Sequence, residues 1–158
     1  GSGIVLDSSS SNKLCKNNVS ANKTGVSLAG AKDNAICLNN FVGNTGGNVT
    51  SVNSTNVWST PQVIYDYDSS TYPGYLGNNW SGYTGKDNNN NGVGDSSYAI
   101  GSEADGYPLM KGFESYNVHP QANFDVSRTS GDEPLLAKFY DNSIGYDGII
   151  SWAWDFGD

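Results

Sequence analysis

The 158 residues carry eight basic and sixteen acidic side chains, giving a net charge of −8, and only 36% of them are apolar. A chain without a basic face lacks what phosphate binding requires, so nucleic acid is excluded as an expected partner. The sequence contains no run of about 18 apolar residues, so it predicts no membrane-spanning helix. Asn, Ser, Thr and Gly accompany ten Tyr, five Phe and four Trp, a mixture that favours short strands between tight turns and therefore an all-β fold.

The first 60 residues repeat with a period of 22. Leu14 aligns with Ile36 and then Trp58, and Cys15 aligns with Cys37. The identities fall on glycine and asparagine, at Gly3, Gly25 and Gly47, at Asn12, Asn34 and Asn56, and at Asn17 and Asn18 with Asn39 and Asn40. Such a repeat predicts coils stacked about 4.8 Å apart. In the first coil we expect strands near residues 3–6, 13–16 and 19–20, with like residues directly above one another.

These residues carry a family resemblance. Residues 3–22 and 25–44 resemble the NosD-type, carbohydrate-associated right-handed parallel β-helix repeat, and the likeness extends to about residue 60. Residues 78–110 resemble the segment that closes such β-helices in archaeal cell-surface proteins. The resemblance implies a short right-handed parallel β-helix with its capping segment over residues 1–112. Trp80, Tyr83 and Tyr98 would cover its open end, where bare strand edges otherwise invite aggregation.

The two cysteines of the sequence occupy matching positions in adjacent repeats. Stacked coils would bring the Cα atoms of Cys15 and Cys37 into the range that a disulfide permits. An exported chain with two cysteines favours that bond, so a disulfide is the first prediction. A pair of free stacked thiols and a copper or zinc pair are the alternatives, although one His and one Met in the whole chain put copper delivery in doubt.

A calcium loop is predicted at residues 87–95. Oxygen-bearing side chains recur at every second position, and Gly92 follows where a sharp turn is needed. Calcium prefers six to eight oxygen ligands in such an alternating arrangement. The expected ligands are Asp87, Asn89, Asn91, the backbone carbonyl of Val93, and Asp95. The alternative is an Asn/Gly turn that binds no ion.

Glycans could be attached to the chain or bound by it. Candidate acceptors are the asparagines of five Asn-x-Ser/Thr triplets, at Asn18, Asn22, Asn48, Asn53 and Asn79. Between the repeat and the calcium loop lies a tyrosine-rich strip that could stack on sugar rings, formed by Tyr65, Tyr67, Tyr72 and Tyr75. Packing of these rings inside an irregular loop is the alternative for the strip.

The last part of the chain, residues 113–158, resembles the start of a polycystic-kidney-disease (PKD) domain, an immunoglobulin-like β-sandwich. The likeness rests on Pro120, Ala122, Phe124, Ser130, Gly131, Pro134, Leu135, Phe139, Asp141, Ser143 and the run from Trp154 to Asp158. It implies inward-facing side chains at Phe124, Leu136, Phe139, Ile150, Trp152 and Trp154. A complete domain would need roughly forty further residues, so a partial sandwich is expected to expose an apolar face that another chain could complete by strand addition.

Together these features predict a non-catalytic structural or adhesive protein of a cell envelope, sheath or filament, located outside the cell. Expected partners are copies of the chain or neighbouring surface domains, and glycans. The single histidine, His119, has no convincing Ser-His-Asp or Cys-His set around it. A carbohydrate-binding module is the alternative. A glycan-cleaving fragment is a more distant one, with Asp7, Asp33, Asp66 and Asp68 as the available acids.

Overall fold

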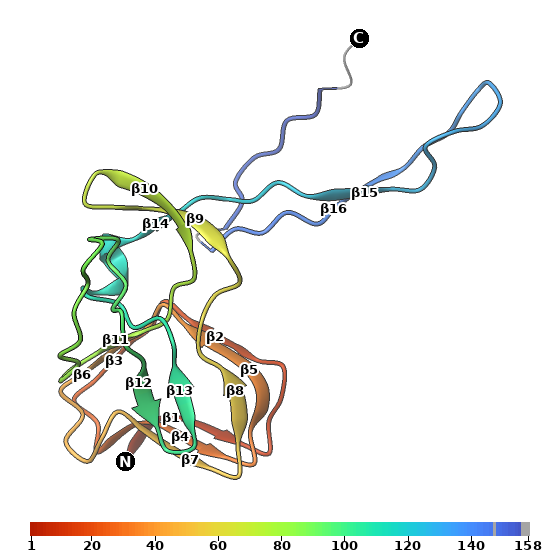
Figure 1. Ribbon diagram of the computed structural model, residues 1–158. Helices are drawn as coiled ribbons and strands as arrows, with labels where there is room; N and C mark the ends of the chain where they lie inside the picture. The colour runs from red at the N-terminus through yellow and green to blue at the C-terminus, as the bar shows by residue number, and fades with distance from the viewer. Residues whose placement is uncertain (147, 156–158) are drawn as a thin grey trace. The chain divides into compact units, whose positions relative to one another are not determined.

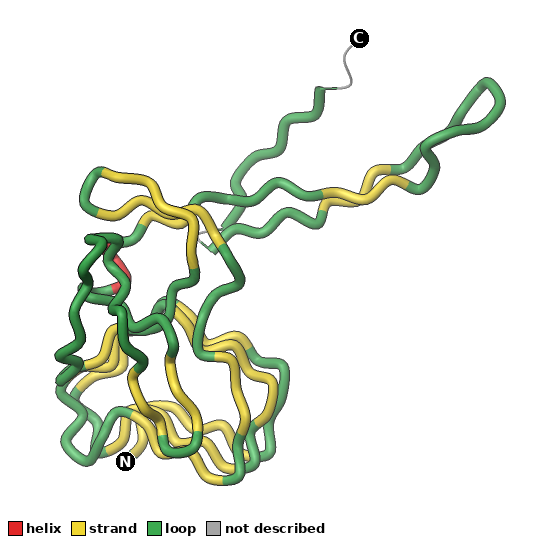
Figure 2. Tube along the Cα trace, viewed as in Figure 1, coloured by secondary structure: helices red, strands yellow, loops and turns green. Residues whose placement is uncertain are grey.

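The computed structural model describes residues 1–146 and 148–155. The chain forms two compact units, Gly1–Asn117 and Val118–Asp158, and each is described by itself. The sequence placed the domain boundary between residues 112 and 113. Both units are built from strands and loops, and the single helical element is a 3-10 turn, η1 (Phe113–Ser115), so the all-β prediction is confirmed over the described part of the chain (Figure 2).

Nine strands of the first unit form three parallel sheets (Figure 1). The first sheet contains β1 (Ser2–Asp7), β4 (Thr24–Ala29) and β7 (Val49–Val52), in that order. The second contains β2 (Lys13–Cys15), β5 (Lys32–Cys37) and β8 (Thr55–Val57). The third has β6 (Asn40–Val42) between β3 (Asn18–Ser20) and β11 (Asn79–Trp80). The chain therefore visits the three sheets in rotation.

The strand register follows the 22-residue period. Leu14 pairs with Ile36, Cys15 with Cys37, and Val19 with Phe41. The third coil departs from the expected alignment because Val26 pairs with Val49, 23 residues later. An irregularity between β5 and β8 absorbs the extra residue, so that Ala35 again pairs with Val57 at the predicted offset.

The third coil is interrupted before its last strand. A hairpin of β9 (Val63–Tyr67) and β10 (Ser70–Gly74) leads the chain away before β11 returns to pair with β6, placing Trp80 beside Phe41. The two rings stack with centroids 4.5 Å apart. Trp80, which was predicted to help cover the open end of the stack, thus supplies a strand residue of the third coil.

Residues from all three sheets share one apolar core. Val26, Leu28, Ile36 and Phe41 are buried there together with Trp80. A second hairpin, β12 (Tyr98–Ile100) and β13 (Glu103–Asp105), adds Ile100 and Tyr98 to this core. The next strand, β14 (Asn117–Val118), spans the boundary between the two units.

The second unit contains one antiparallel pair, β15 (Phe124–Val126) and β16 (Phe139–Asp141), among its described residues. Phe124, Phe139 and Trp154 gather with ring centroids 5.4 to 6.0 Å apart. The side chains expected to face inward are exposed; they are Phe124, Leu136, Phe139, Ile150, Trp152 and Trp154. A partial sandwich is expected to leave this apolar face uncovered, because two strands cannot enclose a core, and the inward-facing role of these residues in a complete domain stays a prediction. Phe156, Gly157 and Asp158, which complete the PKD-like motif, lie outside the described residues.

Candidate functional site

Two ladders of asparagine side chains run through the coils with a fixed direction. In the first, the backbone N–H and the Nδ2 amide of Asn12 both donate to Oδ1 of Asn34, each at 2.9 Å. Asn34 donates in the same way to Asn56. In the second ladder Asn17 donates to Asn39, and Asn39 donates to Asn78. Each rung therefore needs an acceptor on the next rung.

Carboxylates supply the final acceptor of these ladders. The backbone N–H of Asn56 donates to Glu103 Oε1. Both donors of Asn78 reach Asp105 Oδ2, from its backbone at 2.7 Å and from Nδ2 at 3.2 Å. Asn18, which is exposed, and Asn40, which is buried, both donate to Glu114, and the hydrogen bond from Asn40 lowers the pKa of that carboxyl. Glu103 and Asp105 thus occupy the place that the next asparagine would take.

Asp105 is the buried acid of the first unit. Besides Asn78 it accepts hydrogen bonds from Trp80 Nε1 at 2.9 Å and from the backbone N–H of Tyr107 at 2.9 Å. Its side chain is fully inaccessible to solvent. Burial raises the pKa of Asp105, while the four hydrogen bonds act in the opposite direction. The carboxyl joins the second ladder, β11 and the segment after β13.

The predicted ion-binding loop uses its side-chain oxygens on its own backbone. Asp87 accepts hydrogen bonds from the backbone N–H groups of Asn91 at 3.1 Å and Gly92 at 2.8 Å. Asn89 Oδ1 also accepts from Asn91, and Asn91 Oδ1 accepts from Val93. Asp95 accepts at Oδ2 from the backbone and side chain of Asn88. These bonds are those of a turn closed by Asx side chains.

Tyrosine hydroxyl groups hold the carbonyl side of the same loop. Tyr72 donates to the carbonyl of Asn90 and Tyr65 to that of Asn91, each at 3.0 Å, while Tyr116 donates to the carbonyl of Gly92. Burial raises the pKa of Tyr65 to about 12. Gly92 adopts a φ of +85°, and a Cβ there would collide with the rings of Tyr67 and Tyr116.

Removing the Tyr116 hydroxyl should loosen this loop. Tyr116→Phe removes the hydroxyl that donates to the carbonyl of Gly92 and accepts from the N–H of Met110, inside a buried cluster, while these two backbone groups keep their own hydrogen bond at 2.9 Å. We expect a loss of about 1–2 kcal/mol in the free energy of unfolding, measured by urea denaturation. Tyr72→Phe, the matched change at an exposed bond, should cost less than about 1 kcal/mol. Equal losses for both variants would contradict this role.

The tyrosine strip divides into buried and exposed members. Tyr65 and Tyr67 are buried, so their faces pack against the protein, with the Tyr67 ring stacked on Tyr116 at 4.9 Å. Tyr72 is partly buried and Tyr75 is 39% exposed. Tyr75 stacks on Tyr107, a residue that the sequence analysis did not single out, with centroids 4.8 Å apart.

The five candidate glycan acceptors differ in their surroundings. The side-chain amide of Asn22 belongs to a ladder with Asn44, and Asn48 is buried. Asn18 is exposed and bonded to Glu114, while the amide of Asn79 donates to the carbonyl of Leu109. Asn53 is exposed in a left-handed turn with a φ of +50°. Glycosylation at these positions stays a prediction, and Asn53 offers the most accessible amide.

The two cysteines lie side by side on β2 and β5. Cys15 and Cys37 are in register, and their Sγ atoms are 2.6 Å apart as free thiols. Cys37 is fully buried and Cys15 is partly exposed. The stacking of the two residues follows the predicted repeat, and the disulfide between them stays a prediction.

The second unit has a cavity of about 410 Å³ beside its aromatic cluster. Phe124, Phe139 and Trp154 contribute apolar walls, and Asp141 lies among the polar lining residues. Asp141 accepts hydrogen bonds from the backbone N–H of Ser143 and from Trp152 Nε1. Its carboxylate is therefore already engaged in organising the turn.

Stacked parallel sheets with asparagine ladders define a coiled, repetitive all-β protein. The chain belongs to the NosD family, described as periplasmic copper-binding protein, whose family model matches residues 1–85. That description puts the family on the envelope side of the cell, in agreement with the coarse form of the predicted location. No curated protein and no solved structure matches the chain. No helix in the described part is long and apolar enough to cross a membrane.

The calcium prediction is overturned. The family is described as copper-binding, and residues 1–146 and 148–155 contain no group of three or more His, Cys, Asp or Glu side chains arranged to hold a metal ion. The physical reason lies in the loop itself. The oxygens of Asp87, Asn91 and Asp95 point at backbone N–H groups, so the alternating pattern builds a turn.

One set of donors in the structure suits copper, the metal that the family description implies. Copper(I) is selected by soft sulfur ligands, imidazole also suits copper, and carboxylate ligands suit harder ions. The sequence has two Cys, one Met and one His, and the structure brings Cys15 and Cys37 into contact. Two thiolates fit copper(I), which accepts few ligands. They do not fit the four-ligand site that structural zinc requires.

Sequence reasoning missed Glu103, Asp105 and Asn78 as ladder residues. A signal for Asn78 was present, because the Asn-Asn pairs at 17–18 and 39–40 recur at 78–79. Asn78 follows Asn39 by 39 residues, so the fixed offset of 22 could not find it. The two acids gave no signal, since an acid that replaces an asparagine breaks the identity on which the repeat was detected.

Proposed function

We propose that the chain is a non-catalytic structural module of a cell surface, sheath or extracellular filament, located outside the cytoplasm, and that its first unit is a short right-handed parallel β-helix. The observation that carries this proposal is the pair of directional ladders ended by Glu103 and Asp105. Strands that return to parallel neighbours through such connections are right-handed in nearly all proteins. A stack of this kind is a rigid spacer, which suits a surface protein.

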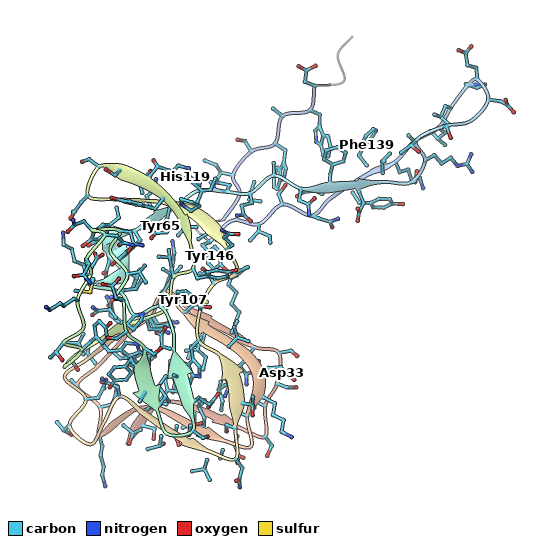
Figure 3. The ribbon with its side chains drawn as sticks, viewed as in Figure 1. Asp33, Tyr65, Tyr107, His119, Phe139 and Tyr146 are labelled. Atoms are coloured by element: carbon cyan, nitrogen blue, oxygen red, sulfur yellow. The ribbon has the colours of Figure 1, made fainter. Side chains whose placement is uncertain are left out.

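The surroundings of the carboxylates support a non-catalytic role. Glycan cleavage needs two acids facing a groove. Asp66 accepts hydrogen bonds from Thr71 and Asn117, and Asp68 forms an ion pair with Lys111 at 2.9 Å. These two acids form polar contacts on the surface of the hairpin of β9 and β10, while Asp33 lies on the outside of the coil (Figure 3).

The second unit supplies the assembly part of the proposal. Its resemblance to a PKD domain favours a module that works beside other surface domains, as does the resemblance of the capping segment to archaeal surface proteins. Ile150 is 96% exposed and Leu136 is 75% exposed, and exposed apolar residues in such numbers mark a contact surface. We expect copies of the chain to associate there by adding strands to β15 and β16.

Sedimentation velocity over a range of concentrations tests this assembly. The full chain should sediment as a reversible mixture of monomer and larger species, and Ile150→Ser with Leu136→Ser should shift it to the monomer. Ile64→Ser, at an exposed position of the first unit, is the matched control and should leave the distribution unchanged. A chain that stays monomeric at every concentration would remove the self-assembly proposal.

A carbohydrate-binding module is the second candidate, favoured by the stacked pair Tyr75 and Tyr107, which are 39% and 38% exposed. Exposed aromatic faces stack on sugar rings through their apolar surfaces. A glycan array separates the candidates. Retention of one glycan class, lost in Tyr75→Ala, would favour binding over a purely structural role.

A further inference from the structure

Cys15 and Cys37 form an isolated pair of sulfur donors between two coils. They stand at the ends of β2 and β5, in register and on the same side of one sheet. Their neighbours Leu14 and Ile36 face the apolar core, so alternation turns the cysteines to the opposite face. The partial exposure of Cys15 gives a small ligand access to the pair.

Basic residues lie close to the pair along the chain. Lys13 and Lys16 are within two residues of Cys15. Positive charge near a sulfur atom stabilises the thiolate form that binds metal ions.

We propose that Cys15 and Cys37 bind a single copper(I) ion through their two Sγ atoms. This inference goes beyond the structural role proposed above and does not depend on it. The ion adds to both sulfur atoms while the two thiols release two protons, so copper stays in the same oxidation state and the site carries one negative charge. Lys13 and Lys16 offset that charge. The sulfur atoms must separate from their 2.6 Å contact, and the spacing of about 4.8 Å between stacked strands leaves room for it.

Two sulfur ligands set the selectivity of the site. Thiolates prefer copper(I) to hard cations, and zinc in structural sites takes four ligands. In the described part of the chain no group of three or more His, Cys, Asp or Glu is arranged around a common point. The pair should therefore discriminate strongly in favour of copper(I) over zinc.

The test uses the full chain, reduced and kept free of oxygen. Copper(I) is supplied as its complex with the chromogenic chelator bathocuproine disulfonate, and the copper that the protein withdraws is read from the loss of colour. We expect one ion per chain. Cys15→Ser and Cys37→Ser should each weaken binding by at least about 100-fold. Met110→Leu, which removes the remaining sulfur of the sequence, should bind like the parent chain.

X-ray absorption on the loaded parent chain gives a readout that needs no variant. Two sulfur neighbours around copper support the proposal, whereas nitrogen or oxygen neighbours contradict it. Failure to withdraw copper from the chelator also contradicts it, as does unchanged binding by the Cys15→Ser, Cys37→Ser double variant. A chain that holds the two cysteines as a disulfide resistant to reductant, detected by intact mass, would overturn the proposal in favour of a structural bond.

Discussion

Asp105→Ala is expected to destabilise the first unit by about 3–5 kcal/mol, because it removes the acceptor that several buried N–H donors share, and each buried group left unsatisfied costs about 1–3 kcal/mol. The donors are both N–H groups of Asn78, the Trp80 indole and the backbone of Tyr107. Chemical denaturation followed by tryptophan fluorescence measures the loss. Because the second ladder ends at this carboxyl, the variant should also lower the protection of the Asn78 amide against hydrogen exchange.

Asp105→Asn keeps the shape of the side chain but removes its charge. Its carbonyl can still accept from Asn78, but its amide would face the N–H of Tyr107, so we expect an intermediate cost of about 1–3 kcal/mol. Asp33→Asn makes the same change at an exposed position and should stay within about 0.5 kcal/mol of the parent. If Asp105→Asn and Asp33→Asn behave alike, the carboxyl does not end the ladder.

The raised pKa of Asp105 also fixes the sign of a pH effect. Burial lifts this pKa above the ordinary value of 3.8, so the folded chain binds the proton more tightly than the unfolded chain. The contribution of Asp105 to the free energy of unfolding therefore falls as pH rises from about 3.8 through the raised pKa. Asp105→Asn should flatten the stability profile across that window.

Trp80→Ala should cost about 3–5 kcal/mol in the free energy of unfolding, the usual effect of emptying a buried tryptophan site. Its ring lies between two aromatic neighbours, stacked on Phe41 at 4.5 Å and on Tyr98 at 4.4 Å. The substitution also removes the indole donor to Asp105. Thermal denaturation should show the first unit melting at a markedly lower temperature.

Two further variants locate the origin of this loss. Trp80→Phe keeps the stack but removes the indole donor, so it should recover part of the stability. Trp152→Ala, at an exposed tryptophan of the second unit, should leave the melting of the first unit unchanged. If Trp80→Ala loses no more stability than Trp152→Ala, Trp80 does not join the third coil to the hairpin of β12 and β13.

The coils were predictable because side-chain stacking imposes identity. An asparagine amide that donates to the residue above needs an asparagine there, so Asn12, Asn34 and Asn56 recur at a fixed spacing. Apolar positions need only similar volume, and the series Leu14, Ile36 and Trp58 drifts accordingly. The 22-residue period therefore predicted the register of β2 with β5. It did not predict the pairing of β11 with β6, because the hairpin inserted before β11 changes the spacing in the third coil.

The predicted metal loop shows where a pattern is ambiguous. Alternating Asp and Asn oxygens can converge on a cation or turn toward the backbone N–H groups of their own loop, and the sequence is the same in both cases. Tyrosine hydroxyl groups from distant segments favour the turn, because they donate to its backbone carbonyls. Tyr65, Tyr72 and Tyr116 bind the carbonyls of Asn91, Asn90 and Gly92, respectively. Such long-range partners carry no local signal.

The central claim is that residues 22 apart in the sequence are neighbours in space. Nuclear Overhauser spectroscopy of the isotopically labelled chain tests it most directly. The account predicts inter-strand backbone contacts between Leu14 and Ile36 and between Val19 and Phe41, together with a contact between Phe41 and Trp80. Spectra in which these strands show contacts only to sequential or hairpin neighbours would contradict it.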